Sequence, residues 1–205
     1  MIWFTSDTHF GHEVVLRSCE RPWAGVGGMN DALVDAINGH VEPGDTLYHL
    51  GDYSFKMTLE DAANLRKRIS CKDVHLIPGN HDKDWAQPAV GWAFTVEKPI
   101  CVLKIGKKEL VLSHYPMADW QGMSHGSIHL HGHIHSRGMQ YNELNRMQGL
   151  YRYDVGVDAN EFRPVSLDEV LAWFDGVPCS GRVDWRNWVN ETGSKAVSRK
   201  LAGCK

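Results

Sequence analysis

The sequence predicts a layered α/β domain around a central sandwich of sheets, and three observations predict it. Short apolar segments alternate with helical patterns in the first half, the second half is richer in strand-like segments, and the apolar segments stop at polar residues or glycines. At 205 residues the chain is long enough for one full hydrophobic core. Because no repeat or low-complexity linker divides it, we expect one domain over residues 1–178 and a C-terminal extension, helical or partly disordered, over 179–205.

The first half is predicted to alternate between strands and helices. Leu33, Val34 and Ile37 follow helical spacing ahead of Gly39, which suits the residue after a helix. Thr58, with Asp61 three residues later, fits the start of another helix. We expect strands over residues 2–6, 46–50 and 74–77, and helices over 29–38 and from 58 onward.

The second half is predicted to be mainly β-structure. Residues 100–105 and 109–113 flank Gly106 and are expected to form a hairpin. Ser166 and Glu169 form a capping-box sequence, which predicts a helix running to about residue 174. We expect two further strands, over residues 129–131 and 153–157.

The composition narrows the class of protein. Apolar residues make up 42% and charged residues 23%, and no apolar run approaches the roughly 18 residues that a membrane span requires. The first residues lack the basic start of a signal peptide, so no membrane partner is expected. Five widely spaced cysteines favour a cytoplasmic protein without thiolate-bound zinc. A net charge of −3 argues against a protein that coats nucleic acid.

Side chains that bind metals follow five of the predicted strands. Loops beyond strand ends are where α/β folds build their sites, because the sheet aims the residues that follow it. Every side chain concerned offers oxygen or imidazole nitrogen and no cysteine is near, which suits Mn²⁺, Fe, Zn²⁺ or Mg²⁺ in a hydrolytic role. The residues are Asp7 and His9, Asp52, Asn80 and His81, His114, and His133 with His135.

The spacing within these motifs favours shared sites. In extended backbone, the side chains of residues i and i+2 point the same way, so Asp7 with His9, and His133 with His135, can each present two ligands to one pocket. The glycines directly before three of the motifs permit tight backbone close to an ion. A single Asp-x-His pair is more often a solvated turn, but five such motifs in this order leave a purely structural explanation little room.

The set of motifs resembles the five signature motifs of the calcineurin-like metallophosphoesterases. The matching segments cover roughly residues 1–160: Asp7-Thr8-His9, Gly51-Asp52, Gly79-Asn80-His81-Asp82, His114, and Gly132-His133-Ile134-His135. The first of them, with Arg21-Pro22-Trp23, is similar to a branch of small phosphohydrolases found in bacteria and their phages. The resemblance implies an α-β-β-α sandwich of mixed sheets flanked by helices.

The resemblance also implies a pair of divalent metal ions. Mn²⁺ is favoured, with Fe, Zn, Ni and Mg as alternatives. His81 would not be a ligand but would face the substrate phosphate, as general acid or as a donor to developing charge. The expected ligands form three groups: Asp7, His9 and His135 on the first ion, Asn80, His114 and His133 on the second, and Asp52 bridging both.

Elementary chemistry agrees with these roles. Two cations about 3.5–4 Å apart would clamp a phosphate and acidify a bridging water, so that a hydroxide attacks phosphorus in line. Asp52 would be both a ligand and a catalytic residue. Bridging two cations is expected to need a carboxylate with two anionic oxygens, which suits an aspartate at this position. Asn80 supplies a neutral carbonyl, which keeps the charge low enough to admit an anionic substrate. The leaving alkoxide needs a proton, and His81 is the natural donor.

Several neighbouring residues have more than one interpretation. His12 and His49 are expected to support the ligands or to pack, not to bind metal. Asp82 could form a hydrogen bond beside the acid histidine or cap a helix. Arg21 could grip a second phosphate, although a surface role is favoured, and His131 could line the pocket or lie in the core.

The expected substrate is a small phosphodiester or a nucleotide. The residues after Asp52 lack the Asp-Arg-Gly run of protein serine/threonine phosphatases, which puts a phosphoprotein substrate in doubt and leaves His81 without an identified carboxylate partner. One alternative is a nuclease on larger nucleic acid, which would need a basic rim that the charge balance does not show; another is a phosphomonoesterase. A non-enzymatic metal-binding scaffold is disfavoured, because it would be expected to lose ligands or the acid histidine.

Overall fold

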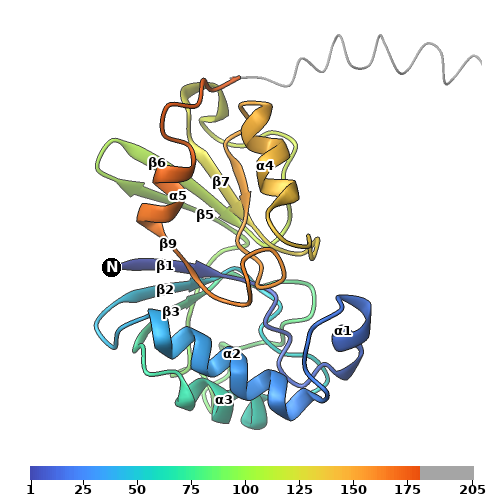
Figure 1. Ribbon diagram of the computed structural model, residues 1–205. Helices are drawn as coiled ribbons and strands as arrows, with labels where there is room; N and C mark the ends of the chain where they lie inside the picture. Colours follow the sequence, from blue (N-terminus) through green and yellow to red (C-terminus); the bar gives the residue numbers. More distant parts are fainter. Residues whose placement is uncertain (181–205) are drawn as a thin grey trace, which may run out of the picture.

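The computed structural model describes residues 1–180, which form two sheets packed face to face with helices on their outer sides (Figure 1). The strand order is β4-β3-β2-β1-β9 in the first sheet and β5-β6-β7-β8 in the second. Both sheets are mixed, because β9 runs antiparallel to β1 and β5 antiparallel to β6, while the other neighbours are parallel. The predicted fold class is confirmed. Residues 181–205 lie outside the described residues, so the extension predicted over 179–205 stays a prediction.

The elements have the following bounds. The first sheet contains β1 (Ile2–Thr5), β2 (Thr46–His49), β3 (Asp73–Leu76), β4 (Thr95–Val96) and β9 (Val165–Ser166). The second contains β5 (Ile100–Ile105), β6 (Lys108–Ser113), β7 (Ile128–His131) and β8 (Arg152–Asp154). The helices are α1 (Glu13–Ser18), α2 (Val26–His40), α3 (Leu59–Arg68), α4 (Gln140–Met147) and α5 (Leu167–Trp173), with a short 3₁₀ helix at Met123–His125.

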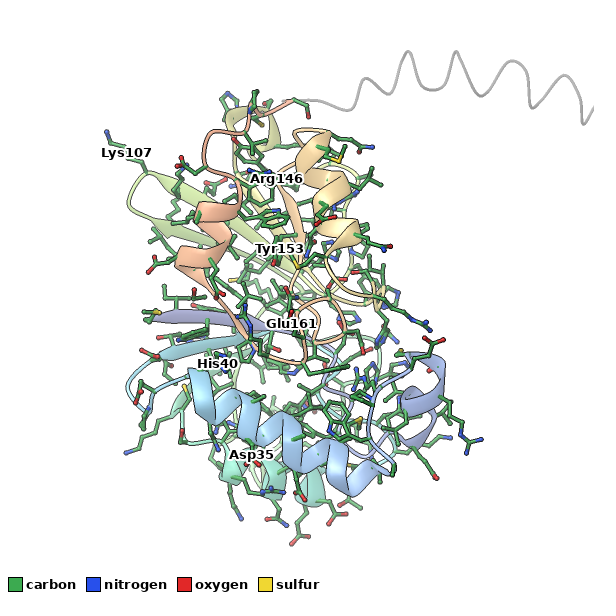
Figure 2. All side chains as sticks on the ribbon, in the orientation of Figure 1. Asp35, His40, Lys107, Arg146, Tyr153 and Glu161 are labelled. Atoms are coloured by element: carbon green, nitrogen blue, oxygen red, sulfur yellow. The ribbon has the colours of Figure 1, made fainter. Side chains whose placement is uncertain are left out.

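Two apolar layers hold the sandwich together. Phe4 from the first sheet belongs to the core between the sheets, with Leu112 and Leu130 from the second. The adjacent residue Trp3 belongs instead to the layer under α2 and α3, because successive strand side chains point to opposite faces. Charged side chains such as Asp35 on α2 and Lys107 in the β5–β6 turn project from the surface (Figure 2). Within residues 1–180, no helix is both long and apolar enough to cross a membrane.

Most predicted elements are confirmed. The predicted hairpin is the β5–β6 pair, and the predicted capping box at the start of α5 is present. At the start of α3, the Thr58 hydroxyl accepts a hydrogen bond from the Asp61 N–H at 3.0 Å, as predicted. The prediction that a helix ends before Gly39 is wrong, because α2 runs on to His40 and the Val41 N–H still bonds to the Ile37 carbonyl.

The strand predicted over residues 153–157 is shorter than expected, because the chain passes there from one sheet to the other. β8 ends at Asp154. The Val155 N–H bonds to the His131 carbonyl of the second sheet, while the Val157 N–H bonds to the Ser6 carbonyl beyond β1. This crossing carries residue 158 to the edge where β1, β2 and β3 end.

Candidate metal centre

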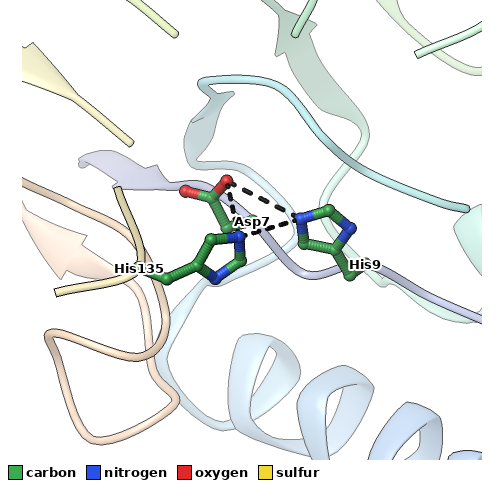
Figure 3. Close-up of side chains that lie close together, drawn as sticks. All are labelled: Asp7, His9 and His135. Carbon is green, nitrogen blue, oxygen red and sulfur yellow. Dashed lines mark hydrogen bonds and ion pairs between the residues drawn. The ribbon is translucent and has the colours of Figure 1, made fainter. Parts of the chain in front are cut away.

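Asp7, His9 and His135 meet at this edge, from the loops after β1 and β7 (Figure 3). The Nε2 atoms of His9 and His135 lie 3.2 Å apart, and Asp7 Oδ1 lies 3.9 and 3.8 Å from them. Asp7 Oδ1 is buried, and within residues 1–180 it has no hydrogen-bond partner. A buried carboxylate oxygen without a partner, facing two imidazole nitrogens, fits a divalent cation.

A second donor set lies next to the first. His114 Nε2 lies 3.1 Å from both Asn80 Oδ1 and His133 Nδ1, and 3.5 Å from Asp52 Oδ2. The same Asp52 oxygen lies 3.5 Å from His9 Nε2 in the first set. The structure therefore brings together all seven side chains expected to be ligands, with Asp52 between the two groups.

Only one oxygen of Asp52 faces the two donor sets. Its Oδ1 accepts a hydrogen bond from the backbone N–H of His81 at 2.8 Å, so Oδ2 alone is shared. The expectation that Asp52 would use both oxygens therefore does not match the geometry. Burial alone would raise the pKa of Asp52, but the hydrogen bond and charge of His114 and the His81 N–H lower it, so the carboxylate stays ionised.

The ring nitrogens that face away from the centre are held by other groups. The Leu50 carbonyl accepts a hydrogen bond from His114 Nδ1 at 2.8 Å. Asp158 Oδ2 lies 2.7 Å from His135 Nδ1, and His12 Nδ1 lies 3.2 Å from His9 Nδ1. Contacts of this kind fix the ring orientation and direct each Nε2 toward the centre. His12 therefore supports His9, one of the expected ligands, as the sequence suggested.

Arg21 and Asp158 form a buried support that the sequence did not predict. Arg21 Nε and Nη2 donate to the two oxygens of Asp158 at 2.8 and 2.9 Å, and Arg21 also donates to the carbonyls of Asp7 and Thr8. Both interpretations of Arg21, as a phosphate grip or a surface residue, are wrong because its guanidinium is buried and paired. Burial lowers the pKa of His135, but the hydrogen bond with Asp158 outweighs it and raises that pKa to about 10.

Asp82 forms hydrogen bonds beside His81, which is one of the two roles considered for it. No helix begins at Asp82 in the described chain, so the capping interpretation is wrong. Its carboxylate accepts hydrogen bonds from the backbone N–H groups of Gly79, Asp52 and Tyr53 at 2.7–2.9 Å. These bonds tie the loop after β2 to the loop after β3, which sets the separation of Asp52 and Asn80.

Two further histidines near the motifs are buried in the interior. His49 lies buried with Nε2 2.9 Å from the Thr8 hydroxyl, a supporting position like the one expected. His131 is fully buried, and burial lowers its pKa well below the ordinary value, so it is a neutral core residue and does not line the site.

His81 lies beside the donor sets and not within them. Its Nε2 is 4.0 Å from Asp52 Oδ2, its ring centroid is 5.5 Å from that of His9, and its side chain is 37% exposed. Within residues 1–180 the side chain makes no hydrogen bond, and its ring packs against Phe55 at 4.7 Å. It is therefore free to meet a ligand that enters from solvent.

A cysteine lies closer to the site than the sequence suggested. Cys19 Sγ lies within 4.8 Å of ligand atoms of both His135 and Asp158. The expectation that no cysteine is near is therefore wrong, because α1 ends beside Arg21, which anchors this segment to Asp158.

Comparisons with known proteins agree with this arrangement. Residues 1–151 match the calcineurin-like phosphoesterase superfamily domain. An uncharacterized protein of Methanocaldococcus jannaschii is 29% identical over 171 residues, covering 83% of this chain and 89% of that protein. The gene 66 protein of Mycobacterium phage D29 is 30% identical over 184 residues, covering 77% of this chain and 88% of that protein.

A solved structure from Aquifex aeolicus, a protein of unknown function, has the same fold. It aligns with a TM-score of 0.66 at 24% identity, over 84% of this chain and 98% of that one. The segment that matches the family, residues 1–151, contains all seven clustered side chains: Asp7, His9, Asp52, Asn80, His114, His133 and His135. The chain therefore belongs to the calcineurin-like phosphoesterase superfamily, a family of metal-dependent hydrolases of phosphate esters.

Proposed function

We propose that this protein is a phosphodiesterase that hydrolyses small phosphodiesters or nucleotides with a pair of divalent cations. The observation that carries the proposal is the position of Asp52 Oδ2, which lies 3.5 Å from Nε2 of both His9 and His114. One carboxylate oxygen shared by two donor sets is what a binuclear centre requires. The oxygen and nitrogen donors suit Mn²⁺ first, with Fe, Zn, Ni or Mg as alternatives.

With two divalent cations bound, the proposed ligands would leave the site with a net positive charge. When bound, two divalent cations would offset the charge of a phosphate and would lower the pKa of a coordinated water. In the metal-bound site the ligands would be four neutral imidazoles, the amide of Asn80 and only two carboxylates, Asp7 and Asp52. The surplus positive charge favours an anionic substrate, and the buried positions of Asp7 and Asp52 limit competition from water.

His81 is proposed as the group that donates a proton to the leaving oxygen. Its ring is partly exposed, stands beside the shared Asp52 oxygen and is held edge-on by Phe55. A proton donor matters most when the leaving group is a poorly acidic alkoxide, as in most natural diesters. We therefore expect diesters to be preferred over monoesters.

The cellular setting belongs to the same proposal. Cys19, Cys71, Cys101 and Cys179 are all free thiols, and a reducing, cytoplasmic compartment would keep them so.

Metal analysis and a substrate pair test the proposal. Protein reconstituted with Mn²⁺ is expected to hold near two equivalents, and Asp52→Asn should lower both occupancy and activity, because it removes the shared anionic oxygen. The kcat/KM of bis(p-nitrophenyl) phosphate should exceed that of p-nitrophenyl phosphate. One equivalent of metal with full activity would contradict the binuclear centre, and a clear monoester preference would contradict the assignment as a phosphodiesterase.

A further inference from the structure

Tyr115 places an exposed aromatic ring beside the second donor set. It directly follows His114, and its ring lies edge to face with the rings of His114 and His133, at centroid distances of 5.0 and 4.6 Å. Its side chain is 48% exposed. The two imidazole contacts hold the ring in place, and about half of the side chain is left open to a second planar group.

The aromatic ring on the other side of the centre is not open in this way. Phe55 packs against His81 and His12, at 4.7 and 4.1 Å between centroids. The ammonium group of Lys56 lies 5.3 Å from the centre of the Phe55 ring and covers it. Phe55 therefore orients imidazoles, whereas Tyr115 has free surface.

The two ester groups of a diester would lie on different sides of the centre. His81 lies on the side of the first donor set, beside His9. If His81 protonates the leaving oxygen, as the proposed function on which this inference rests requires, the leaving alcohol lies on that side. The retained alcohol is then the group that can reach Tyr115, beside the second set.

We propose that Tyr115 is a stacking platform for a planar base on the retained alcohol, so that the preferred substrates are nucleoside phosphodiesters. Tyrosine offers a large rigid surface at low conformational cost, and stacking on it accepts any base. By the usual strength of base–aromatic stacking, the platform lowers KM by roughly 5- to 100-fold.

Two substrates with the same leaving group test this assignment. Thymidine 5′-(p-nitrophenyl phosphate) and methyl p-nitrophenyl phosphate both release p-nitrophenolate and differ only in the retained alcohol. In the wild-type Mn²⁺-loaded protein, KM is expected to be roughly 5- to 100-fold lower for the thymidine ester. The ratio should fall toward one in Tyr115→Ala and persist in Tyr115→Phe, which keeps the ring.

Trp92→Ala is the matched control. Trp92 is a similarly exposed aromatic, at 53%, but it packs under Lys67 of α3, away from the ligands, so its removal should leave the ratio unchanged. The metal content of each variant is measured alongside, because Tyr115 also contacts His133.

Each outcome is decisive. If the wild-type protein hydrolyses both esters with equal KM, or if Tyr115→Ala keeps the ratio, the stacking role is wrong and the proposed phosphodiesterase function stands. If Tyr115→Ala loses metal, the residue supports His133 and the stacking role is likewise wrong. If neither ester is hydrolysed, the proposed function itself fails.

Discussion

At the residue scale, most of the proposed ligands occupy a backbone conformation that side chains seldom adopt. Asp7, His9, Asp52, His133 and His135 have φ between +47° and +74°. The extended backbone expected for the two pairs is therefore wrong, and His133 and His135 reach different donor sets. Asp and His tolerate this region better than most residues, and conformations of this kind concentrate at functional sites. Hydrogen bonds that Arg21 donates to the carbonyl of Asp7, and that the Asp82 carboxylate accepts from the N–H of Asp52, hold the chain there.

The side chain of His81 is expected to be catalytic without being a ligand. Asp52 Oδ1 is bound by the His81 backbone N–H, so His81→Ala should leave both Asp52 and the metal content unchanged. We expect kcat to fall by roughly 10²–10⁴-fold, the usual contribution of a general acid. The defect should be smaller for a p-nitrophenolate leaving group than for an alkyl alkoxide, because the former needs no proton.

Loss of metal in His81→Ala would show that the residue is a ligand after all. An equal defect with both leaving groups would show that it stabilises charge and does not donate a proton.

Asp158 is expected to position His135 and to neutralise Arg21. Asp158→Asn should weaken the first cation by roughly 10–100-fold, the usual effect of removing a partner behind a ligand histidine. It should also lower the free energy of unfolding by about 3–5 kcal/mol, because the Arg21 guanidinium is left buried without its counter-charge. Mn²⁺ titration followed by electron paramagnetic resonance measures the first effect, and urea unfolding of the metal-free protein the second.

Asp31→Asn provides the exposed control. Asp31 pairs with Arg68 at 2.9 Å, but both side chains are largely exposed, so the change should cost at most about 1 kcal/mol. Unchanged Mn²⁺ affinity in Asp158→Asn would show that Asp158 does not support the metal site.

The sequence could predict which side chains gather at the centre as proposed ligands, but not which residues hold them in place. The ligands stand in short motifs at strand ends, where residue type and neighbours are both informative. Arg21 and Asp158 are 137 positions apart, and their pairing depends on the chain crossing from the second sheet to the first. The one signal in the sequence for the role of Asp158 was its place directly after the strand predicted at 153–157.

At the element scale, predictions succeeded where the signal is local and failed where tertiary contacts decide. The caps of α3 and α5 involve residues three positions apart, and both are present. The end of β8 depends on carbonyls of β7 and of the β1 loop, which no local pattern contains. Helices α1 and α4 and the short strands β4 and β9 were not predicted, and α1, β4 and β9 each have too few residues to show a period.

Close approach of the β7 and β1 loops is expected to make Gly132 irreplaceable. A Cβ at Gly132 would lie less than 3.0 Å from Ser6 Oγ and Asp7 Oδ2, and neither loop has room to move without shifting a ligand. Gly132→Ala should therefore reduce Mn²⁺ affinity and activity together, with a loss of stability of roughly 1–3 kcal/mol.

Gly27→Ala is the matched control. Gly27 lies in α2, and a Cβ there would meet nothing within 4 Å. The change should stabilise the helix by roughly 0.5–1 kcal/mol and leave activity unchanged. Equal activity of the two alanine variants would show that the loops are not packed as tightly as the structure indicates.

At the scale of the whole molecule, each donor set draws on both sheets. Asp7 and His9 follow the first sheet, while His135 follows the second. In the other set, Asp52 follows the first sheet and His114 the second. The packing of the sandwich core therefore sets the distances within the centre, and cation binding in turn should stabilise the folded chain over the unfolded one.

This stabilisation is expected to grow with pH. Burial raises the pKa of Asp7 to about 7, from an ordinary value of 3.8. Between about pH 4 and about pH 7, the Asp7 carboxyl is protonated in the metal-free folded protein but ionised in the unfolded chain. The stability that this proton contributes is therefore lost as pH rises from about 4 to about 7. A cation needs the ionised carboxylate and must displace that proton below pH 7, which weakens binding there. His135, with a pKa of about 10, must also lose a proton, which extends the same trend above pH 7.

The rise in Tm caused by a fixed, subsaturating Mn²⁺ concentration should accordingly be larger at pH 7.5 than at pH 6, and metal-free Tm values at each pH provide the baseline. In Asp7→Asn a cation has no proton to displace at position 7. The rise in Tm caused by Mn²⁺ should therefore be smaller than in the wild-type protein and should depend less on pH. The matched variant His81→Ala, which leaves every proposed ligand in place, should keep the wild-type dependence. A response that is equal or larger at pH 6 would show that cations do not displace protons from Asp7 and His135, and these two residues would then no longer be supported as ligands of the first cation.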